Sequence, residues 1–195
     1  KKKTKNIKKT PQLLGNESAQ LVEVLNQWPT SEDSINLAPI ALRKEIENWQ
    51  RILQPTVNDG VYRCGFARNQ TAYEKASGEL FEALNKANQS LQTKGPWLCG
   101  EQLTLADIRL FPTLIRWEMI YSPLFGCSQE PLWSLSNLWD WRKKLHEIPA
   151  VAATCDALAW RKDYFGALFP LRPSNIIPSG PDLGRMVNAS PPDLK

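Results

Sequence analysis

Apolar residues recur at intervals of three and four along most of the chain, and this period limits the fold more than any other feature of the sequence. The clearest case runs from about Gln70 to Gln92, where the apolar residues fall on one face of a helix. Lys94-Gly95-Pro96 ends that helix, and a tight loop over residues 97–100 follows. Helices with one apolar face must bury it against each other, so we expect an all-α helical bundle.

The same period predicts further helices. They cover roughly ten residues after Asn16-Glu17-Ser18, and then residues 40–53, 105–121, 135–146 and 150–160. A segment rich in Ser, Asp, Asn and Pro separates the first two and is interpreted as a linker, and Asn58-Asp59-Gly60 predicts a turn. Beyond Phe169 the chain has six prolines and no helical period, so we expect an extended tail.

The composition is that of an ordinary folded protein and excludes several classes. Hydrophobic residues make up 42% and charged residues 23% of the 195 residues, close to the average of globular proteins. No stretch reaches the roughly 18 apolar residues of a membrane span, and no signal peptide is visible. The net charge of +4 comes from six lysines among the first nine residues. The rest of the chain is near neutral, so we expect neither nucleic acid nor a membrane as a partner.

The cysteines and the single histidine exclude most metal and nucleophile chemistry. Cys64, Cys99, Cys127 and Cys155 are scattered along the chain without a CxxC pair, whereas a disulfide framework or a zinc site needs clustered cysteines. Thiols scattered in this way suit a reducing compartment, so we expect a cytoplasmic protein. His146 lies in a predicted helix among charged neighbours and is interpreted as a surface residue. We predict no metal site.

One motif has a direct physical interpretation. Thr104 precedes a predicted helix, and its hydroxyl can accept a hydrogen bond from the amide of Asp107 while the Asp107 carboxylate reaches back to the Thr104 amide. Leu103 and Ile108 can form the apolar contact that accompanies such a capping box. We therefore interpret Thr104 and Asp107 as a structural cap rather than as catalytic residues.

Two arginines share one face of the helix predicted over residues 105–121. Arg109 and Arg116 are seven residues apart, which is close to two helical turns. We interpret Arg109, which is near Asp107 in the sequence, as structural rather than catalytic.

Several segments resemble one family. Residues 100–107 resemble the start of the buried helix in the C-terminal domain of glutathione transferases. Residues 58–67 are similar to the NxGVYxxGFA signature of the glutathionyl-hydroquinone reductases, the Xi class of that superfamily. Residues 107–116 are similar to the central helix of that class, and residues 163–166 with 173–181 resemble its C-terminal tail. The resemblance covers most of the chain.

The resemblance implies a protein with a thioredoxin-like domain followed by an all-α domain. On this reading the chain holds the glutathione S-transferase C-terminal-like helical bundle together with a remnant strand, around Lys8 to Leu14, and a remnant helix of the thioredoxin-like α/β domain. The expected division is residues 1–29 for the end of that domain, 30–39 for a linker, 40–169 for the all-α domain and 170–195 for an extended Pro-rich tail.

The resemblance also implies an activity, the glutathione-dependent reduction of glutathionylated hydroquinones. In that reaction a cysteine thiolate takes the glutathione off the ring, the hydroquinone leaves, and a second glutathione clears the mixed disulfide. Glutathione is then a co-substrate and not a permanently bound cofactor, the partners are glutathione and glutathionylated quinones or hydroquinones, and the expected assembly is a homodimer. The catalytic cysteine of the family lies in a CPWA-type motif that is absent from this sequence. We therefore expect a fragment of a longer protein that is inactive by itself.

Five residues of this chain match functional positions of the family. Tyr62 is implied as proton donor and acceptor, and the hydroxyls of Tyr121 and Tyr164 are implied to stabilise the thiolate. Glu17 and Ser18 are implied to bind the γ-glutamyl end of glutathione, which suits the start of a helix. Taken from the residues alone, the tyrosines are ordinary amphipathic side chains and the Glu-Ser pair is a helix N-cap.

Two other functions remain open from the sequence. The chain can be a non-enzymatic helical binding or scaffold domain with a truncated transferase fold, or part of a general glutathione S-transferase that acts on other electrophiles. The role of Tyr62 in catalysis distinguishes these functions from the reductase.

Overall fold

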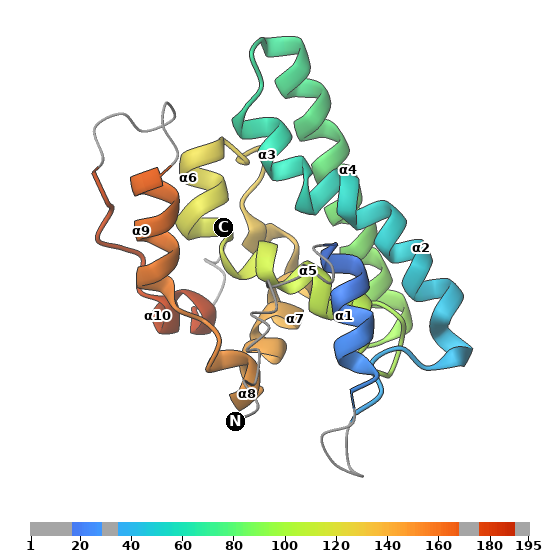
Figure 1. The fold of residues 1–195 in the computed structure, drawn as a ribbon. Helices are drawn as coiled ribbons and strands as arrows, with labels where there is room; N and C mark the ends of the chain where they lie inside the picture. Colours follow the sequence, from blue (N-terminus) through green and yellow to red (C-terminus); the bar gives the residue numbers. More distant parts are fainter. Residues whose placement is uncertain (1–16, 29–34, 168–175, 190–195) are drawn as a thin grey trace, which may run out of the picture.

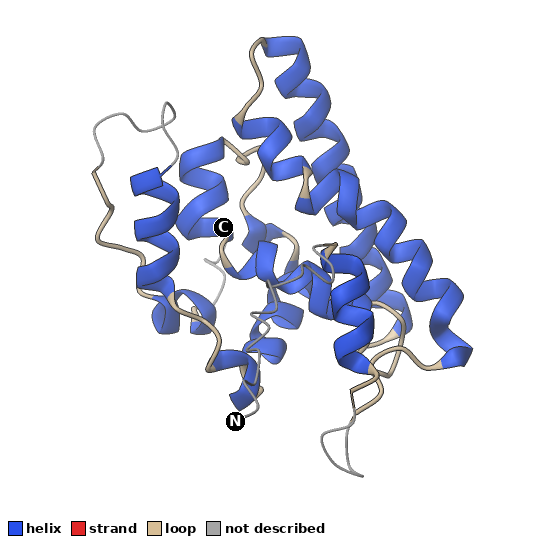
Figure 2. Ribbon diagram, viewed as in Figure 1, coloured by secondary structure: helices blue, strands red, loops and turns tan. Residues whose placement is uncertain are grey.

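The residues with a helical period form helices in the structure, as Figures 1 and 2 show. This computed structural model describes residues 17–28, 35–167 and 176–189. Within these ranges the only strand-like pairing is an isolated bridge between Trp97 and Gly100, so the predicted all-α fold is confirmed. The strand expected around Lys8 to Leu14 lies outside the described residues.

The helical elements follow one another with short connections. In chain order they are α1 (Ser18–Asn26), η1 (Ile40–Leu42), α2 (Arg43–Leu53), η2 (Gln54–Asn58), α3 (Gly60–Gly65), α4 (Gln70–Lys94), α5 (Leu105–Ile115), η3 (Trp117–Tyr121), α6 (Ser122–Phe125), η4 (Leu132–Ser134), α7 (Ser136–His146), α8 (Pro149–Ala152), α9 (Ala157–Ala167) and α10 (Leu183–Asn188). Helix α4 packs against α3 and α7, and α5 packs against α2 and α7. Their buried apolar side chains form one continuous core.

The long helix α4 confirms the clearest sequence prediction. Its N-cap is Asn69, whose side chain accepts a hydrogen bond from the amide of Ala72 (2.8 Å). It ends at Gly95, whose φ of +127° is a conformation that side-chain-bearing residues rarely adopt. The apolar stripe of α4 is buried along its length, which gives α3 and α7 a surface to pack on.

The predicted turn at residues 58–60 is wrong, because the chain stays helical there. The amide of Asp59 donates to the carbonyl of Gln54 (2.9 Å), five residues back, so η2 is a π-helical turn that leads directly into α3. Pro55 lies in the first turn of η2, where a missing N–H is tolerated, and so does not end the helical path. Gly65 then allows α3 to approach α6, since a Cβ there would lie 2.5 Å from the Phe125 ring.

The helix predicted over residues 105–121 is interrupted. Helix α5 ends at Ile115, and after Arg116 the second π-helical turn, η3, continues into α6. Pro112 lies inside α5, where it removes one hydrogen bond of the helix.

The single helix predicted over residues 150–160 is wrong as well. Helix α8 is short and ends at Ala152, and a separate helix, α9, begins at Ala157. The Asp156 side chain caps α9 by accepting a hydrogen bond from the amide of Ala159 (2.9 Å). Pro149 starts α8 as predicted.

The tail beyond Phe169, which we expected to be extended, contains one short helix in its described part. Residues 176–182 have no regular structure, but residues 183–188 form helix α10, capped by Asp182, whose side chain accepts from the amide of Arg185 (2.9 Å). Met186 and Val187 are buried. Burial of these two side chains, rather than a periodic pattern, explains why so short a helix forms.

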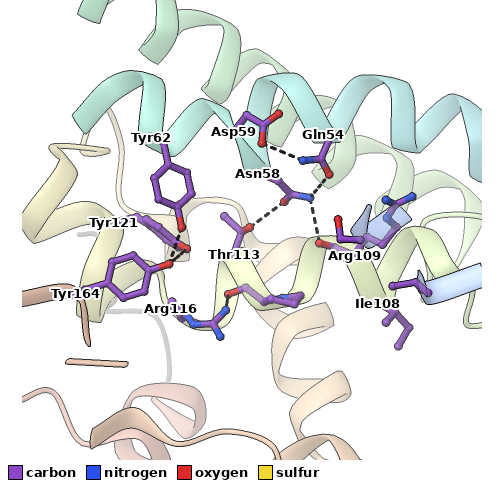
Figure 3. Close-up of a pocket in the computed structure, with 13 residues that line it drawn as sticks. Gln54, Asn58, Asp59, Tyr62, Ile108, Arg109, Thr113, Arg116, Tyr121 and Tyr164 are labelled. Carbon is purple, nitrogen blue, oxygen red and sulfur yellow. Dashed lines mark hydrogen bonds between the residues drawn. The ribbon is translucent and has the colours of Figure 1, made fainter. Parts of the chain in front are cut away.

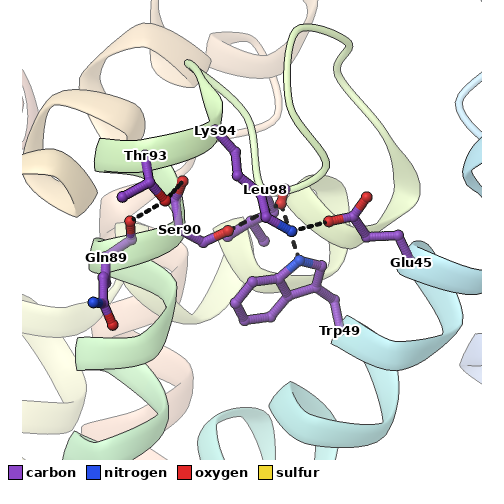
Figure 4. Close-up of polar contacts among 7 residues, drawn as sticks. All are labelled: Glu45, Trp49, Gln89, Ser90, Thr93, Lys94 and Leu98. Carbon is purple, nitrogen blue, oxygen red and sulfur yellow. Dashed lines mark hydrogen bonds and ion pairs between the residues drawn. The ribbon is translucent and has the colours of Figure 1, made fainter.

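The capping box at the start of α5 is present and connects more than its own helix. Asp107 is fully buried, and its carboxylate accepts from the Thr104 amide (3.0 Å) and hydroxyl (3.0 Å). It also accepts from the Leu98 amide (2.9 Å) and from the Trp141 indole of α7 (2.9 Å). The Leu98 carbonyl in turn accepts from the Trp49 indole of α2 (3.0 Å), as Figure 4 shows. One buried carboxylate therefore links α5, α7 and the loop before α5, and through Leu98 also α2.

Replacing Asp107 by alanine is expected to lower the free energy of unfolding by about 3 kcal/mol or more, because a lost cap adds to three buried N–H donors left without a partner. The matched control is Asp156→Ala, which removes the exposed cap of α9 and should cost about 1 kcal/mol. Urea unfolding followed by circular dichroism measures both. Equal losses in the two variants would show that Asp107 acts as a cap alone.

Candidate active site

An open cavity of about 470 Å³ lies where several elements of the bundle meet, and it holds most of the site residues expected from the sequence (Figure 3). Its walls come from α1, η2, α3, α5, η3 and α9. The lining residues are Ser18, Val22, Gln54, Asn58, Asp59, Tyr62, Ile108, Arg109, Pro112, Thr113, Arg116, Tyr121 and Tyr164.

The three expected tyrosines meet at one side of this cavity. The Tyr164 hydroxyl lies 2.6 Å from the Tyr62 hydroxyl and 2.9 Å from the Tyr121 hydroxyl, so it bridges the other two. The side chains come from α9, α3 and η3, and their hydroxyls point toward one another in Figure 3. We call these three residues the tyrosine cluster. Residues separated by 102 and 43 positions in the sequence thus share one hydrogen-bonded group.

The rings of the tyrosine cluster are fixed by aromatic packing. Phe125 of α6 is buried beneath them, with centroid distances of 5.3 Å to Tyr62, 5.6 Å to Tyr121 and 6.2 Å to Tyr164. Tyr121 also meets the other two rings edge to face. Tilted and edge-to-face contacts at these distances are favourable, so the hydroxyls are held in position by the rings that carry them.

Burial keeps two of these hydroxyls protonated. Desolvation raises the pKa of Tyr62 above its ordinary value, and the hydrogen bond to Tyr164 raises it further. Desolvation also raises the pKa of Tyr121, which is 3% exposed, and its hydrogen bonds to the other two tyrosines act in the same direction. At neutral pH both are neutral phenols, which can donate a hydrogen bond.

A second polar network lines the cavity beside the tyrosine cluster and was not predicted from the sequence. The Asn58 amide donates to the Arg109 carbonyl (3.2 Å) and accepts from the Thr113 hydroxyl (2.8 Å). These bonds tie η2 to α5 across the cavity. Asn58 lies within the segment that resembles the reductase signature, and that is the one signal in the sequence that pointed to it.

Arg109 of α5 and Arg116, the residue after that helix, also line the cavity. Arg109 is half-buried, and burial lowers its pKa while Glu23 of α1 acts in the opposite direction. The carboxylate of Asp107 takes its hydrogen bonds from other residues. Arg109 thus has no hydrogen bond to Asp107 and lies in the cavity wall, and its interpretation as structural rather than catalytic stays a prediction.

Only one of the two residues expected to bind glutathione lines the cavity. Ser18 does so, as the first residue of α1. Glu17 is exposed and precedes the helix in the N-cap position, but its side chain makes no capping hydrogen bond. Glu17 thus occupies the N-cap position given by the plainer interpretation of the pair, but it caps the helix without a side-chain hydrogen bond.

The cysteines do not form a centre of their own. All four are free thiols, with Cys64, Cys99 and Cys127 buried. Among the residues that the structure describes, no group of three or more His, Cys, Asp or Glu could hold a metal ion. No helix in the same ranges is long and apolar enough to span a membrane.

Comparison with known proteins identifies the fold. Residues 70–153 match the model of the glutathione S-transferase C-terminal domain. The chain is 36% identical over 171 residues to the glutathionyl-hydroquinone reductase PcpF of Sphingobium chlorophenolicum, an alignment that covers 87% of this chain and 54% of PcpF. The glutathione-bound structure of YqjG, a glutathione transferase homolog from Escherichia coli K-12, is 34% identical with a TM-score of 0.79, covering 87% of this chain and 56% of that one. The Xi glutathione S-transferase of Phanerochaete chrysosporium is 35% identical with a TM-score of 0.79, covering 85% and 58%.

These matches and the helical fold agree on the class of fold: residues 70–153 match the glutathione S-transferase C-terminal domain, and the helical bundle is that of the glutathione transferases to which the chain is similar. Within the superfamily it is similar to glutathionyl-hydroquinone reductases and Xi-class transferases, as the sequence predicted. The chain spans about half the length of the curated relatives it matches, 54% of PcpF and 53% of YqjG.

The raised pKa of Tyr121 predicts a loss of stability in alkali. Above pH 10.0, the ordinary tyrosine pKa, the unfolded chain loses this proton while the folded protein keeps it, so the free energy of unfolding falls as the pH rises. In Tyr121→Phe this difference is absent, and we expect a shallower fall. Urea unfolding at a series of pH values measures both profiles. Parallel profiles above pH 10.0 would contradict a raised pKa of Tyr121 in the folded protein.

Proposed function

We propose that this chain is the C-terminal part of a glutathione-dependent reductase of glutathionylated hydroquinones, and that it supplies the hydroquinone pocket and part of the glutathione site. The observation that carries the proposal is the tyrosine cluster. Three hydroxyls that the family resemblance implies as functional lie within hydrogen-bond distance of one another in one open cavity.

In this proposal the tyrosines have different roles because their surroundings differ. Tyr62 is 37% exposed and its hydroxyl faces the cavity, so it exchanges a proton with the aromatic ring as the carbon–sulfur bond breaks. Tyr121 and Tyr164 donate hydrogen bonds to the sulfur of the attacking thiolate, and hydrogen bonds to the charged form stabilise it. In the family that the chain resembles, the thiolate belongs to a CPWA-type motif, which this sequence does not contain.

Glutathione binding is proposed at the other end of the cavity. Ser18 lines it at the start of α1, where free backbone amides and the helix dipole favour a carboxylate. Glu17, next to it, is proposed to bind the ammonium group of the γ-glutamyl end. Glutathione then acts as a co-substrate that enters and leaves.

We further propose that residues 1–29 close a thioredoxin-like domain, that residues 30–39 form a linker and that residues 40–169 form the all-α domain. Helix α1 and the residues just after it support this division, because their apolar side chains are exposed and need a further apolar surface to cover them. Leu21, Val24 and Leu25 of α1 are 44%, 58% and 60% exposed, and Trp28 beyond its end is 68% exposed. The complete protein is proposed to be a cytoplasmic homodimer. The intact mass of the native protein and its mass in solution test these assignments.

Tyr62→Phe in the complete protein is expected to lower kcat/KM for a glutathionyl-hydroquinone about 100-fold, the usual scale for loss of a general acid or base. The matched control is Tyr73→Phe, since Tyr73 donates to the Gly126 carbonyl (2.6 Å) and does not line the cavity. Steady-state kinetics with glutathione as reductant measures both. Full activity of Tyr62→Phe would remove Tyr62 from the mechanism, whereas no reductase activity in the unaltered complete protein would favour a binding module or a general transferase.

Ser18→Ala is expected to raise the KM for glutathione about tenfold, the effect of losing one hydrogen bond to a charged group. The control is Ser136→Ala, because Ser136 is also the first residue of a helix but lies outside the cavity. The same kinetic assay, with glutathione varied, measures the change. An unchanged KM would exclude Ser18 from the glutathione site.

A further inference from the structure

The cavity carries a positive charge that the proposed chemistry does not use. Its described lining includes two guanidinium groups, Arg109 and Arg116, and one carboxylate, Asp59. Asp59 accepts a hydrogen bond from Gln54 (2.9 Å) and stands at the start of α3, so it is engaged with that turn. A net positive lining favours a ligand with a negative charge.

The positive charge of Arg116 is less compensated by acidic side chains than that of Arg109. Glu23 acts electrostatically on Arg109, whereas none of the ion pairs in the described part of the chain includes Arg116. Within that part, the Arg116 side chain makes one hydrogen bond, from Nη1 to the Pro112 carbonyl (2.7 Å), and its buried Nε has no partner. A guanidinium has five N–H donors, so most of those of Arg116 remain for a ligand.

Arg116 is also held beside the tyrosine cluster. Its guanidinium lies over the Trp160 ring, 4.6 Å from the centroid, and the bond to Pro112 fixes it from the other side. Its charge acts on Tyr62, and it lines the same cavity as the tyrosine cluster (Figure 3). A guanidinium fixed in this way is prepared to bind a carboxylate through two parallel hydrogen bonds.

We propose that Arg116 binds an acidic group on the aromatic substrate, so that the site prefers hydroquinones with a ring carboxylate over uncharged ones. The identity of the ring as a hydroquinone rests on the proposed function. The carboxylate pairs with the guanidinium, and the ring hydroxyls lie within reach of the tyrosine cluster in the same cavity. Arg116 is thus a specificity-determining residue of the aromatic end of the site.

The test measures binding without turnover. The complete protein, free of glutathione, is titrated in a calorimeter with gentisate, a hydroquinone that carries one ring carboxylate, and with its methyl ester. We expect gentisate to bind about tenfold more tightly, the scale of a charge-assisted hydrogen-bonded pair. Arg116→Gln removes this preference, whereas Arg68→Gln, which removes an exposed arginine outside the cavity, keeps it.

Each outcome decides the proposal. Equal affinities for gentisate and its ester in the unaltered protein would overturn it without any variant. A preference that survives in Arg116→Gln, shown by its thermal melt to be folded, would assign the charge recognition to another residue. If the complete protein prefers gentisate but has no reductase activity, the anion site at Arg116 stands and the proposed function fails. If it has reductase activity but no preference for gentisate, the proposed function stands and the anion site fails.

Discussion

The bundle depends on a single buried carboxylate. Asp107 is fully buried and accepts four hydrogen bonds, so it cannot be removed without leaving polar groups of three segments without partners. Burial raises its pKa while those hydrogen bonds act against the rise. Because α5 begins at this point, carries Thr113 and ends at its C-cap Arg116, one wall of the cavity is set by the contacts of Asp107.

The two π-helical turns that the structure describes set the other walls. Each holds one residue more than an α-helical turn, which rotates the residues that follow relative to those before. In η2 this rotation precedes Tyr62, and in η3 it includes Tyr121. Asn58 then ties η2 to α5, and both irregular turns contribute residues to the cavity lining. The irregularities of the backbone lie where the side chains of the site are needed.

The features that could be predicted from the sequence depend on contacts between neighbours in the chain, whereas those that could not depend on tertiary contacts. The helix over residues 70–94 and the capping box of Asp107 depend on neighbours in the chain, and both are present. The turn expected at residues 58–60 became helix, because the chain around Pro55 can widen into a π-helical turn. Helix α10 exists because Met186 and Val187 are buried against the rest of the bundle, and no period in so short a segment could show this.

The candidate site shows the same division. Resemblance to a family picked out three tyrosines, but their hydrogen bonds join α3, η3 and α9, and no spacing in the sequence relates those elements. In the sequence Arg116 is only a residue on a helix face, and the absence of an ion pair to it among the described residues becomes visible once the bundle is assembled. Desolvation affects both the tyrosine cluster and Arg116. The burial that keeps Tyr121 protonated also lowers the local dielectric, so the charge of Arg116 acts more strongly on any ligand that displaces water from the cavity.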